Sequence, residues 1–207
     1  MRKPAARKVP SVPRKPNYFP PENVLTRAVP PALAGQREFE EYRFVGIDFS
    51  GADWRGWRFT ECAFEDCNLT GATLTNTAFQ NVAFTGCKLL GLPLHPCREL
   101  LFAVHFEGCQ LDYASFCGRK LPGTRFAGCS LVEADFTQAD LSGAVFDDCQ
   151  LRRAIFHETR LAGADFATAH DVTLDPAFND VKQARFALRS LPGLLAQFDI
   201  VVADGGE

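Results

Sequence analysis

Eight cysteines and four histidines are the side chains of this 207-residue sequence that could hold a metal ion or act as nucleophiles. Five of the cysteines recur at intervals of 20 or 22 residues: Cys67, Cys87, Cys109, Cys129 and Cys149. Such a row could be a thiolate ladder for metal or redox chemistry, or a set of small buried side chains in place of alanine. Zinc needs thiolates that converge on one ion at about 2.3 Å, which evenly stacked cysteines do not provide. We therefore expect the five cysteines to be structural.

His95, Cys97 and Cys117 form a second group, in which three soft ligands could meet at one surface point. The letters HPC match no metal-ligand spacing and a fourth ligand is not evident, so surface and loop roles are favoured over a metal site. The sequence also shows no phosphate-cradling loop, activated nucleophile or paired carboxylates. We predict no enzyme activity, no cofactor and no small-molecule substrate.

A strict five-residue period organises most of the chain. A bulky apolar residue stands at every fifth position twelve times from Phe39 to Leu94, and fourteen times from Leu101 to Phe166. This period is neither the 3.6 of a helix nor the 2.0 of a flat strand, so the chain must turn a corner every five residues. The position two residues before each bulky one is mostly small, and 12 of the 16 glycines lie two positions after a bulky residue, where tight turns need φ > 0.

A longer period of 20 residues indicates four sides per coil, with like residues stacked on like. One column is all phenylalanine: Phe44, Phe64, Phe84, Phe106, Phe126, Phe146, Phe166 and Phe186. The next column holds Leu69, Leu89, Leu111, Leu131 and Leu151. We predict an all-β fold, a right-handed quadrilateral parallel β-helix with a short C-terminal capping helix. About 6.5 coils, each rising about 4.8 Å, would give a rod on the order of 30 Å long.

The motif in these repeats resembles that of the pentapeptide-repeat family: a small residue, a polar residue, Leu or Phe, then two more. "ADLSG" at 139–143 and "GADF" at 163–166 match it directly, and the resemblance covers about 39–191. It implies the solenoid fold but says little about activity.

An irregularity interrupts the repeat, because two residues are inserted between Leu94 and Leu101. If the register resumes at Leu101, Glu99 falls in the small inward position and Arg119 occupies the same position one coil later. Opposite charges about 4.8 Å apart in a buried setting should pair, since either alone is costly to bury. We predict a structural ion pair between Glu99 and Arg119.

The segments outside the repeat differ in charge and composition. Residues 1–36 carry a formal charge of +6 and eight of the 13 prolines, so we expect a basic, flexible arm, part of which (NVLTRAV) covers the N-terminal edge. The β-helix is expected over 37–191 with a loop at 169–183, followed by a capping or dimerisation helix and tail at 190–207. No segment resembles a membrane span or an export signal, and the many unpaired cysteines suit a cytoplasmic location.

Two functions remain open. The first is a non-catalytic binding or scaffold module whose protein partner is unspecified. The second follows from the resemblance to the quinolone-resistance branch of the family, whose dimeric rods mimic DNA and occupy DNA gyrase. That resemblance implies a homodimer through the C-terminal element, with Leu191, Leu194, Leu195 and Phe198 on its apolar side. The charge of residues 37–207 is -9. The acidic residues that could meet a partner are Glu40, Glu41, Glu61, Glu65, Asp66, Glu107, Asp112, Asp147 and Asp148.

Overall fold

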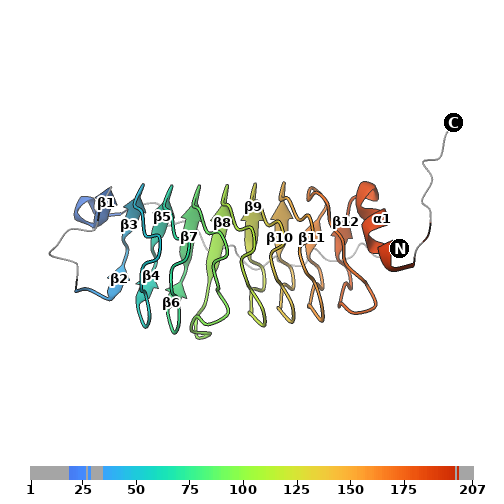
Figure 1. The fold of residues 1–207 in the computed structure, drawn as a ribbon, viewed down its shortest axis with the longest axis horizontal. Helices are drawn as coiled ribbons and strands as arrows, with labels where there is room; N and C mark the ends of the chain where they lie inside the picture. The colour runs from blue at the N-terminus through green and yellow to red at the C-terminus, as the bar shows by residue number, and fades with distance from the viewer. Residues whose placement is uncertain (1–18, 27, 29–34, 199, 201–207) are drawn as a thin grey trace, which may run out of the picture.

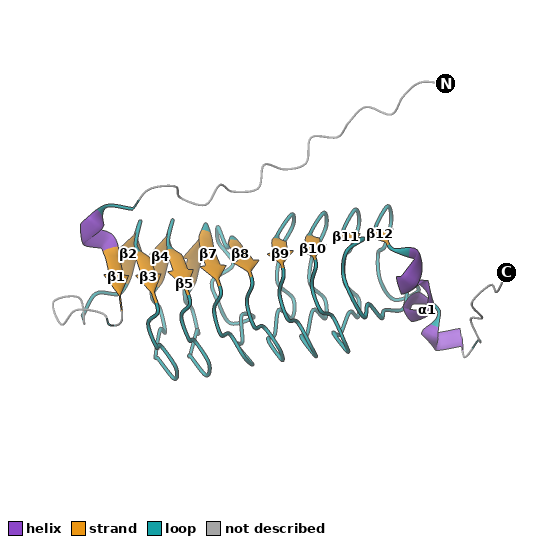
Figure 2. Ribbon diagram, turned by 90° about the horizontal axis from the view of Figure 1, so that it is seen from above, coloured by secondary structure: helices purple, strands orange, loops and turns teal. Residues whose placement is uncertain are grey.

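The chain forms a rod of stacked, four-sided coils in a computed structural model that describes residues 19–26, 28, 35–198 and 200 (Figure 1). Consecutive strands of the long sheet lie side by side along the rod, and the short helical segments lie at its two ends (Figure 2). All strand pairs are parallel. The predicted parallel β-helix with a short C-terminal helix is confirmed.

One side of the rod is a nine-stranded sheet and another carries a three-stranded sheet. The nine strands, in spatial order, are β1 (Val24–Thr26), β3 (Arg43–Val45), β5 (Ala63–Glu65), β7 (Val82–Thr85), β8 (Val104–Glu107), β9 (Arg125–Ala127), β10 (Val145–Asp147), β11 (Asp165–Phe166) and β12 (Arg185–Phe186). The short sheet contains β2 (Glu38–Glu40), β4 (Arg58–Thr60) and β6 (Ala78–Gln80). The helical segments are η1 (Pro21–Asn23), η3 (Leu188–Ser190), α1 (Leu191–Leu194) and η4 (Ala196–Phe198). Isolated parallel bridges connect the coils on the remaining sides.

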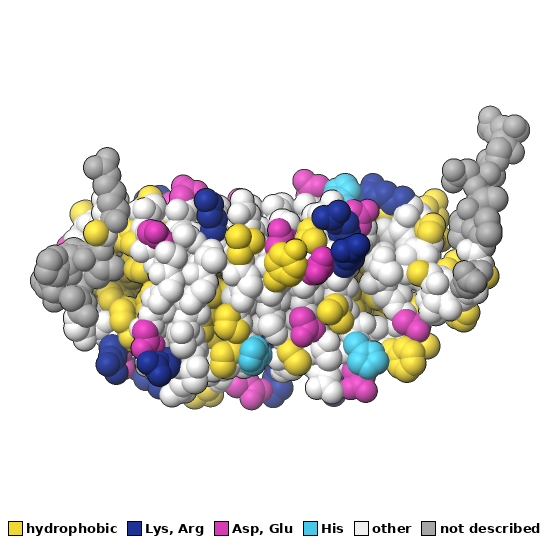
Figure 3. Space-filling model, viewed as in Figure 1, with side chains coloured by type: hydrophobic (Ala, Val, Ile, Leu, Met, Phe, Trp, Pro, Cys, Tyr) yellow, Lys and Arg dark blue, Asp and Glu magenta, His cyan; other side chains and the backbone are white. Residues whose placement is uncertain are grey.

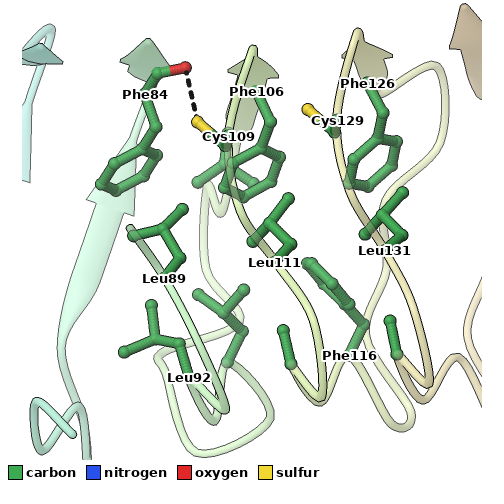
Figure 4. Packing of buried hydrophobic residues seen from close by; sticks show 14 of the residues in the cluster. Phe84, Leu89, Leu92, Phe106, Cys109, Leu111, Phe116, Phe126, Cys129 and Leu131 are labelled. Carbon is green, nitrogen blue, oxygen red and sulfur yellow. Dashed lines mark hydrogen bonds between the residues drawn. The ribbon is translucent and has the colours of Figure 1, made fainter. Parts of the chain in front are cut away.

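The phenylalanine column forms a continuous stack inside the long sheet. From Phe44 to Phe186, successive rings are 4.7–5.4 Å apart between centroids and within 2–13° of parallel. The rings align because strand pairing is in register, so that Phe64 lies opposite Phe84 and Phe84 opposite Phe106. The leucine column runs beside it, and both fill the tube (Figure 4).

The corners of the coils carry left-handed backbone, as the glycine pattern predicts. All twelve glycines that follow a bulky centre by two residues have φ between 60° and 76°. Where the corner is not glycine, asparagine, aspartate or another polar side chain usually adopts the same conformation. The corner conformation therefore sets the five-residue period, and glycine makes it easier to reach.

The two-residue insertion is placed differently from the prediction. Leu101, expected to point inward, is 68% exposed, and its neighbour Leu100 is 76% exposed. The chain bulges outward here and rejoins the sheet at Val104, which pairs with Val82. Leu101 is thus the one member of the five-residue series that lies outside the core, because the inserted residues form this bulge.

Cys97, rather than Glu99, takes the small inward position of this coil. Its amide donates to Leu94 O at 3.2 Å, just as the amide of Thr77 donates to Leu74 O one coil earlier. The old register therefore continues past the point where the sequence suggested a new one. Burying a thiol costs little, whereas the Glu99 carboxylate stays at the surface, where water solvates it.

Both ends of the rod are covered. At the N-terminal end β1 pairs with β3, which places the buried Leu25 against Phe44 and extends the phenylalanine column by one coil. The expectation that this part of the arm covers the edge agrees with the pairing. Counting β1 and the coil of Phe186, the long sheet rises eight steps, on the order of 40 Å rather than 30 Å. Residues 1–18 of the predicted arm lie outside the described residues.

The C-terminal end keeps the coil register further than expected. Within the predicted loop at 169–183, His170 bridges to Gln150, and Asp180 to Arg160. Only the middle departs from the repeat, and there Asn179 restores it by donating to Phe156 O and accepting from the Thr159 amide.

The short helix α1 then packs across the last coil. Gly193 makes this packing close, since a Cβ at this position would lie 2.0 Å from Val172 O.

Candidate functional site: the outer surface and ends of the rod

The five cysteines of the column are buried and bonded to the wall of the tube. The thiols of Cys67, Cys87 and Cys109 each donate to the carbonyl of the phenylalanine one coil earlier, at 3.4 Å. Figure 4 shows this contact between Cys109 and Phe84. The side chains stack instead of converging, so the structural interpretation of the column agrees with the geometry.

The second cysteine group is not brought together as a metal site. Cys97 is buried in the wall, where burial raises the pKa of its thiol to about 12, while His95 is exposed. Among the described residues, no three His, Cys, Asp or Glu side chains are arranged to hold a metal ion. Cys117 is half-buried and is the most accessible of the eight thiols.

The predicted ion pair between Glu99 and Arg119 does not form. Glu99 instead pairs with Lys120 at the surface. Arg119 is buried and donates through Nη1 to Cys97 O at 2.9 Å and through Nη2 to Arg98 O at 3.1 Å. In the following coils, backbone amides fill this role, as when Asp140 N donates to Arg119 O.

Arg119 therefore supports the backbone where the insertion disturbs the ladder. Its guanidinium lies 3.9 Å above the ring of Phe102, which packs at the edge of the core beside Phe79. A planar cation with several donors can serve two carbonyls and one ring at once. The partners of Arg119 are therefore backbone carbonyls and a ring, and the predicted pairing with the Glu99 carboxylate is wrong.

Five of the nine acids singled out in the sequence lie along one edge of the rod, which we name the acidic edge: Glu65, Asp66, Glu107, Asp147 and Asp148. They follow the strands of the long sheet. In the pairing register, Glu65 lies next to Thr85, Thr85 next to Glu107, and Ala127 next to both Glu107 and Asp147. A carboxylate thus recurs at every second coil, about 9.6 Å apart.

Several of the acids are already engaged within the rod. Glu65 receives two hydrogen bonds from Arg43, and Asp147 pairs with Arg125. Asp148 contacts His170 at 3.0 Å, and Asp112 accepts bonds from the Ser130 hydroxyl and the Val132 amide. Three other acids lie off the acidic edge: Glu61 accepts a bond from Asn81, whereas Glu40, at the end of β2, and Glu41, just after it, are exposed.

The C-terminal end exposes an apolar cluster. Leu188 is 85% exposed and Phe198 62% exposed, and Leu191 and Ile200 are exposed beside them in the sequence. Leu194, from the same predicted apolar side, packs against the core instead, and Leu195 is half-buried. The predicted side is therefore divided between capping the last coil and facing solvent.

A groove that the sequence did not suggest also lies at this end. It has a volume of about 560 Å³ and is formed by three separate segments. Its lining residues are Arg152, Arg153, His170, Asp171, Val172, Thr173, Arg189, Ser190 and Gly193. Lys and Arg side chains also gather over the C-terminal coils on the face shown in Figure 3. The five-residue pattern could not reveal this groove, because nothing in the repeat places Arg189 beside Arg152 and Arg153.

Comparison with known proteins identifies the family. Residues 57–136 match a family model described as a pentapeptide repeat region, and residues 129–167 match one described as pentapeptide repeats (8 copies). Together these matches cover just over half of the chain, which belongs to the pentapeptide-repeat family. A search of curated proteins found no match.

Several solved structures are similar in fold. A trypsin-treated form of QnrB1, described as a plasmid-mediated fluoroquinolone resistance protein, is 21% identical, with a TM-score of 0.40, over 87% of this chain and 97% of that chain. HetL from the cyanobacterium Nostoc sp. strain PCC 7120, involved in heterocyst differentiation regulation, is 20% identical, with a TM-score of 0.39, over 74% and 91%. A pentapeptide repeat protein of the Arabidopsis thaliana thylakoid lumen is 19% identical, with a TM-score of 0.31, over 73% and 78%. None of the helices in the described residues could cross a membrane.

Proposed function

We propose that this protein is a non-catalytic binding module that acts through the outer surface and ends of its rod. The observation that carries the proposal is the filled interior: inward side chains from successive five-residue units are buried along the tube and form one continuous apolar core in the described coils. The grooves found among the described residues lie open at the rod ends, where chains or partners can approach. Binding would then be decided by outward side chains.

The exposed apolar cluster favours a homodimer through the C-terminal end. Burying a large apolar side chain contributes about 1.5–3 kcal/mol, so Leu188, Leu191 and Phe198 together could hold two copies. Sedimentation analysis tests this with the double variant Leu191→Ser and Phe198→Ser, which should be monomeric if the wild type is dimeric.

The matched control removes two other exposed apolar side chains, at a distance from this end. The double variant Leu100→Ser and Leu101→Ser alters the bulge, far along the rod, and should leave the dimer intact. A monomeric wild type at tens of micromolar, or equal loss of the dimer in both variants, would remove the proposed C-terminal interface.

A second candidate is a DNA-mimicking interactor of DNA gyrase that protects it from quinolones. The acidic edge favours it, because carboxylates recur along the strand ends at every second coil. The match in charge is partial. DNA carries one charge per about 1.7 Å, so a rod on the order of 40 Å would need roughly 24, whereas residues 37–207 carry a net -9. Partner recognition would therefore use selected carboxylates.

A supercoiling assay with purified gyrase, with and without a quinolone, tests this candidate. The triple variant Glu65→Gln, Glu107→Gln and Asp147→Asn should lose any inhibition or protection seen with the wild type. A control with the same change in charge, Glu22→Gln, Glu38→Gln and Glu158→Gln, should keep it, since these exposed residues lie off the acidic edge. No effect of the wild-type rod at micromolar concentration would eliminate gyrase as the partner and leave the binding module itself in place.

A further inference from the structure

The C-terminal groove gathers positive charge from three parts of the sequence that the fold brings together. Arg152 and Arg153 stand at one corner of the coil, His170 and Asp171 at the corner above, and Arg189 comes from η3. The helix α1 forms one side of the groove, because Gly193 lets the backbone of α1 approach Val172 O. The site therefore exists only in the folded C-terminal end.

Two of the three guanidinium groups in the groove have no acidic partner among the described residues. Arg189 is anchored through Nη2 to Thr168 O at 3.2 Å and Ala169 O at 3.4 Å, both of which are neutral carbonyls. Arg152 makes no side-chain hydrogen bond or ion pair with the residues that the structure describes. Arg153 alone has an acidic partner, Glu133, at 3.3 Å, and its side chain remains largely exposed. Two of the three arginines thus have donors available for a ligand.

The charge balance and the other polar groups select the class of ligand. Glu133 pairs with Arg153 and Asp148 contacts His170 at the margin of the groove, whereas Arg152 and Arg189 have no acidic partner among the described residues. These two arginines give two positive charges that face the groove, with Asp171 as the acid in its lining. Thr173 and Ser190 add hydroxyl groups. A phosphoryl group carries about -1.5 to -2 at neutral pH and offers three acceptor oxygens, which match guanidinium donors in pairs. A carboxylate carries a single negative charge and would balance only half of this positive charge.

We propose that this groove binds a phosphomonoester through Arg152, Arg153 and Arg189. The volume, about 560 Å³, lies within the range of small-molecule sites and is far larger than a phosphate ion, so the phosphoryl group belongs to a larger molecule. The arginines hold the phosphoryl oxygens, the hydroxyls of Thr173 and Ser190 complete the set of donors, and Asp171 limits the affinity by repulsion. The groove adjoins the C-terminal end of the acidic edge, because Asp148 contacts the lining residue His170 at 3.0 Å.

The test is titration of the full-length, isotope-labelled protein at pH 7.5 and constant ionic strength, followed by amide chemical shifts. The probes are phenyl phosphate, phenyl sulfate and inorganic phosphate. Phenyl phosphate should cause saturable shifts confined to residues 152–153, 170–173 and 189–193. Phenyl sulfate has the same shape with a single charge and should bind about tenfold more weakly. Weaker binding of inorganic phosphate than of phenyl phosphate would place the rest of the ester in the groove.

Three variants separate binding from a general effect of charge or folding. Arg152→Gln should weaken phenyl phosphate binding about tenfold, because one charged donor pair is lost. Asp171→Asn should strengthen it about two- to fivefold, since asparagine also tolerates the left-handed backbone at this position, where φ is 53°. Arg160→Gln removes a similarly exposed arginine on another side of the rod and should change nothing.

Several results would overturn the proposal. Equal weakening by Arg152→Gln and Arg160→Gln would indicate general attraction to positive charge. Weaker binding by Asp171→Asn, or equal affinity for phenyl sulfate and phenyl phosphate, would reject a dianion site. Shifts spread along the whole rod, or none at millimolar phenyl phosphate, would reject the groove itself. Thermal melting of each variant shows whether a loss of binding reflects loss of the fold.

Discussion

Replacing Arg119 by methionine should destabilise the rod, although Arg119 forms no ion pair with any residue that the structure describes. Methionine keeps an unbranched apolar side chain that can still lie against Phe102. It removes the two hydrogen bonds to Cys97 O and Arg98 O, at 2.9 and 3.1 Å, and the cation above the ring. The carbonyls at the disturbed corner would then lack these donors.

The size of the effect follows from these contacts. A hydrogen bond from a charged donor contributes about 1.5–3 kcal/mol, and a partly buried cation over a ring about 0.5–2 kcal/mol. Burial lowers the pKa of Arg119, which shows that the buried cation also carries a cost, and methionine would remove that cost. We expect a net loss of about 3 kcal/mol in the free energy of unfolding. For a chain of this length, that loss lowers the melting temperature by about 6–12 °C.

Urea denaturation gives the change in free energy, and hydrogen exchange at residues 97–104 shows whether the corner opens first. Glu99→Gln is the matched control. It breaks only an exposed pair with Lys120 and should lower the free energy of unfolding far less than Arg119→Met does. If Glu99→Gln destabilised the rod as much as Arg119→Met, an ion pair between the two residues would be the better explanation. An unchanged stability for Arg119→Met would refute the role assigned to its guanidinium.

Three further outcomes are expected. Phe126→Ala should lower the free energy of unfolding in urea by about 3–5 kcal/mol, because the ring stacks between neighbours at 5.3 and 5.0 Å; a loss below 1 kcal/mol would contradict the filled tube. Burial lowers the pKa of His105 in the folded protein below its value in the unfolded chain. As the pH decreases below about 6.5, the unfolded chain therefore binds this proton more readily than the folded protein, and the free energy of unfolding decreases. His105→Ala should therefore lose less stability than the wild type between about pH 7 and pH 5, and equal losses would show that this histidine is not responsible. Ellman's reagent should modify only Cys117 in the native protein, since burial raises the pKa of the Cys62 thiol to about 12; rapid reaction of Cys62 would mean that the coil opens locally.

The periodic part of the fold could be predicted because the chain must turn at a corner every five residues, and each turn directs the next bulky side chain inward. A residue such as Phe126 is inward whichever coil it belongs to, and its column follows from counting in twenties. Counting failed at Leu101, where two extra residues could be accommodated before or after the next inward position. The choice depended on which side chain entered the wall, and burying the Cys97 thiol costs far less than burying the Glu99 carboxylate.

The candidate sites were harder to foresee, since they arise where the repeat ends. Arg189 lies beside Arg152 only because the chain leaves the last coil and α1 turns back across it, which depends on a close contact of Gly193. Likewise, the spacing of the acidic edge was present in the sequence, but the pairing of Glu65 with Arg43 needed coordinates. Positions that the coil fixes can be predicted from the sequence, whereas contacts between irregular segments cannot.

The stack of equivalent coils gives this protein an adjustable length. Each coil touches only the ones before and after it, so adding or removing 20 residues in the regular stretch would change the separation of the two ends by about 4.8 Å without altering either end. The strand β1 and the helix α1 would keep their own contacts. The number of coils can therefore set the distance between the two ends of the rod in small, uniform increments, while β1 and α1 cover those ends unchanged.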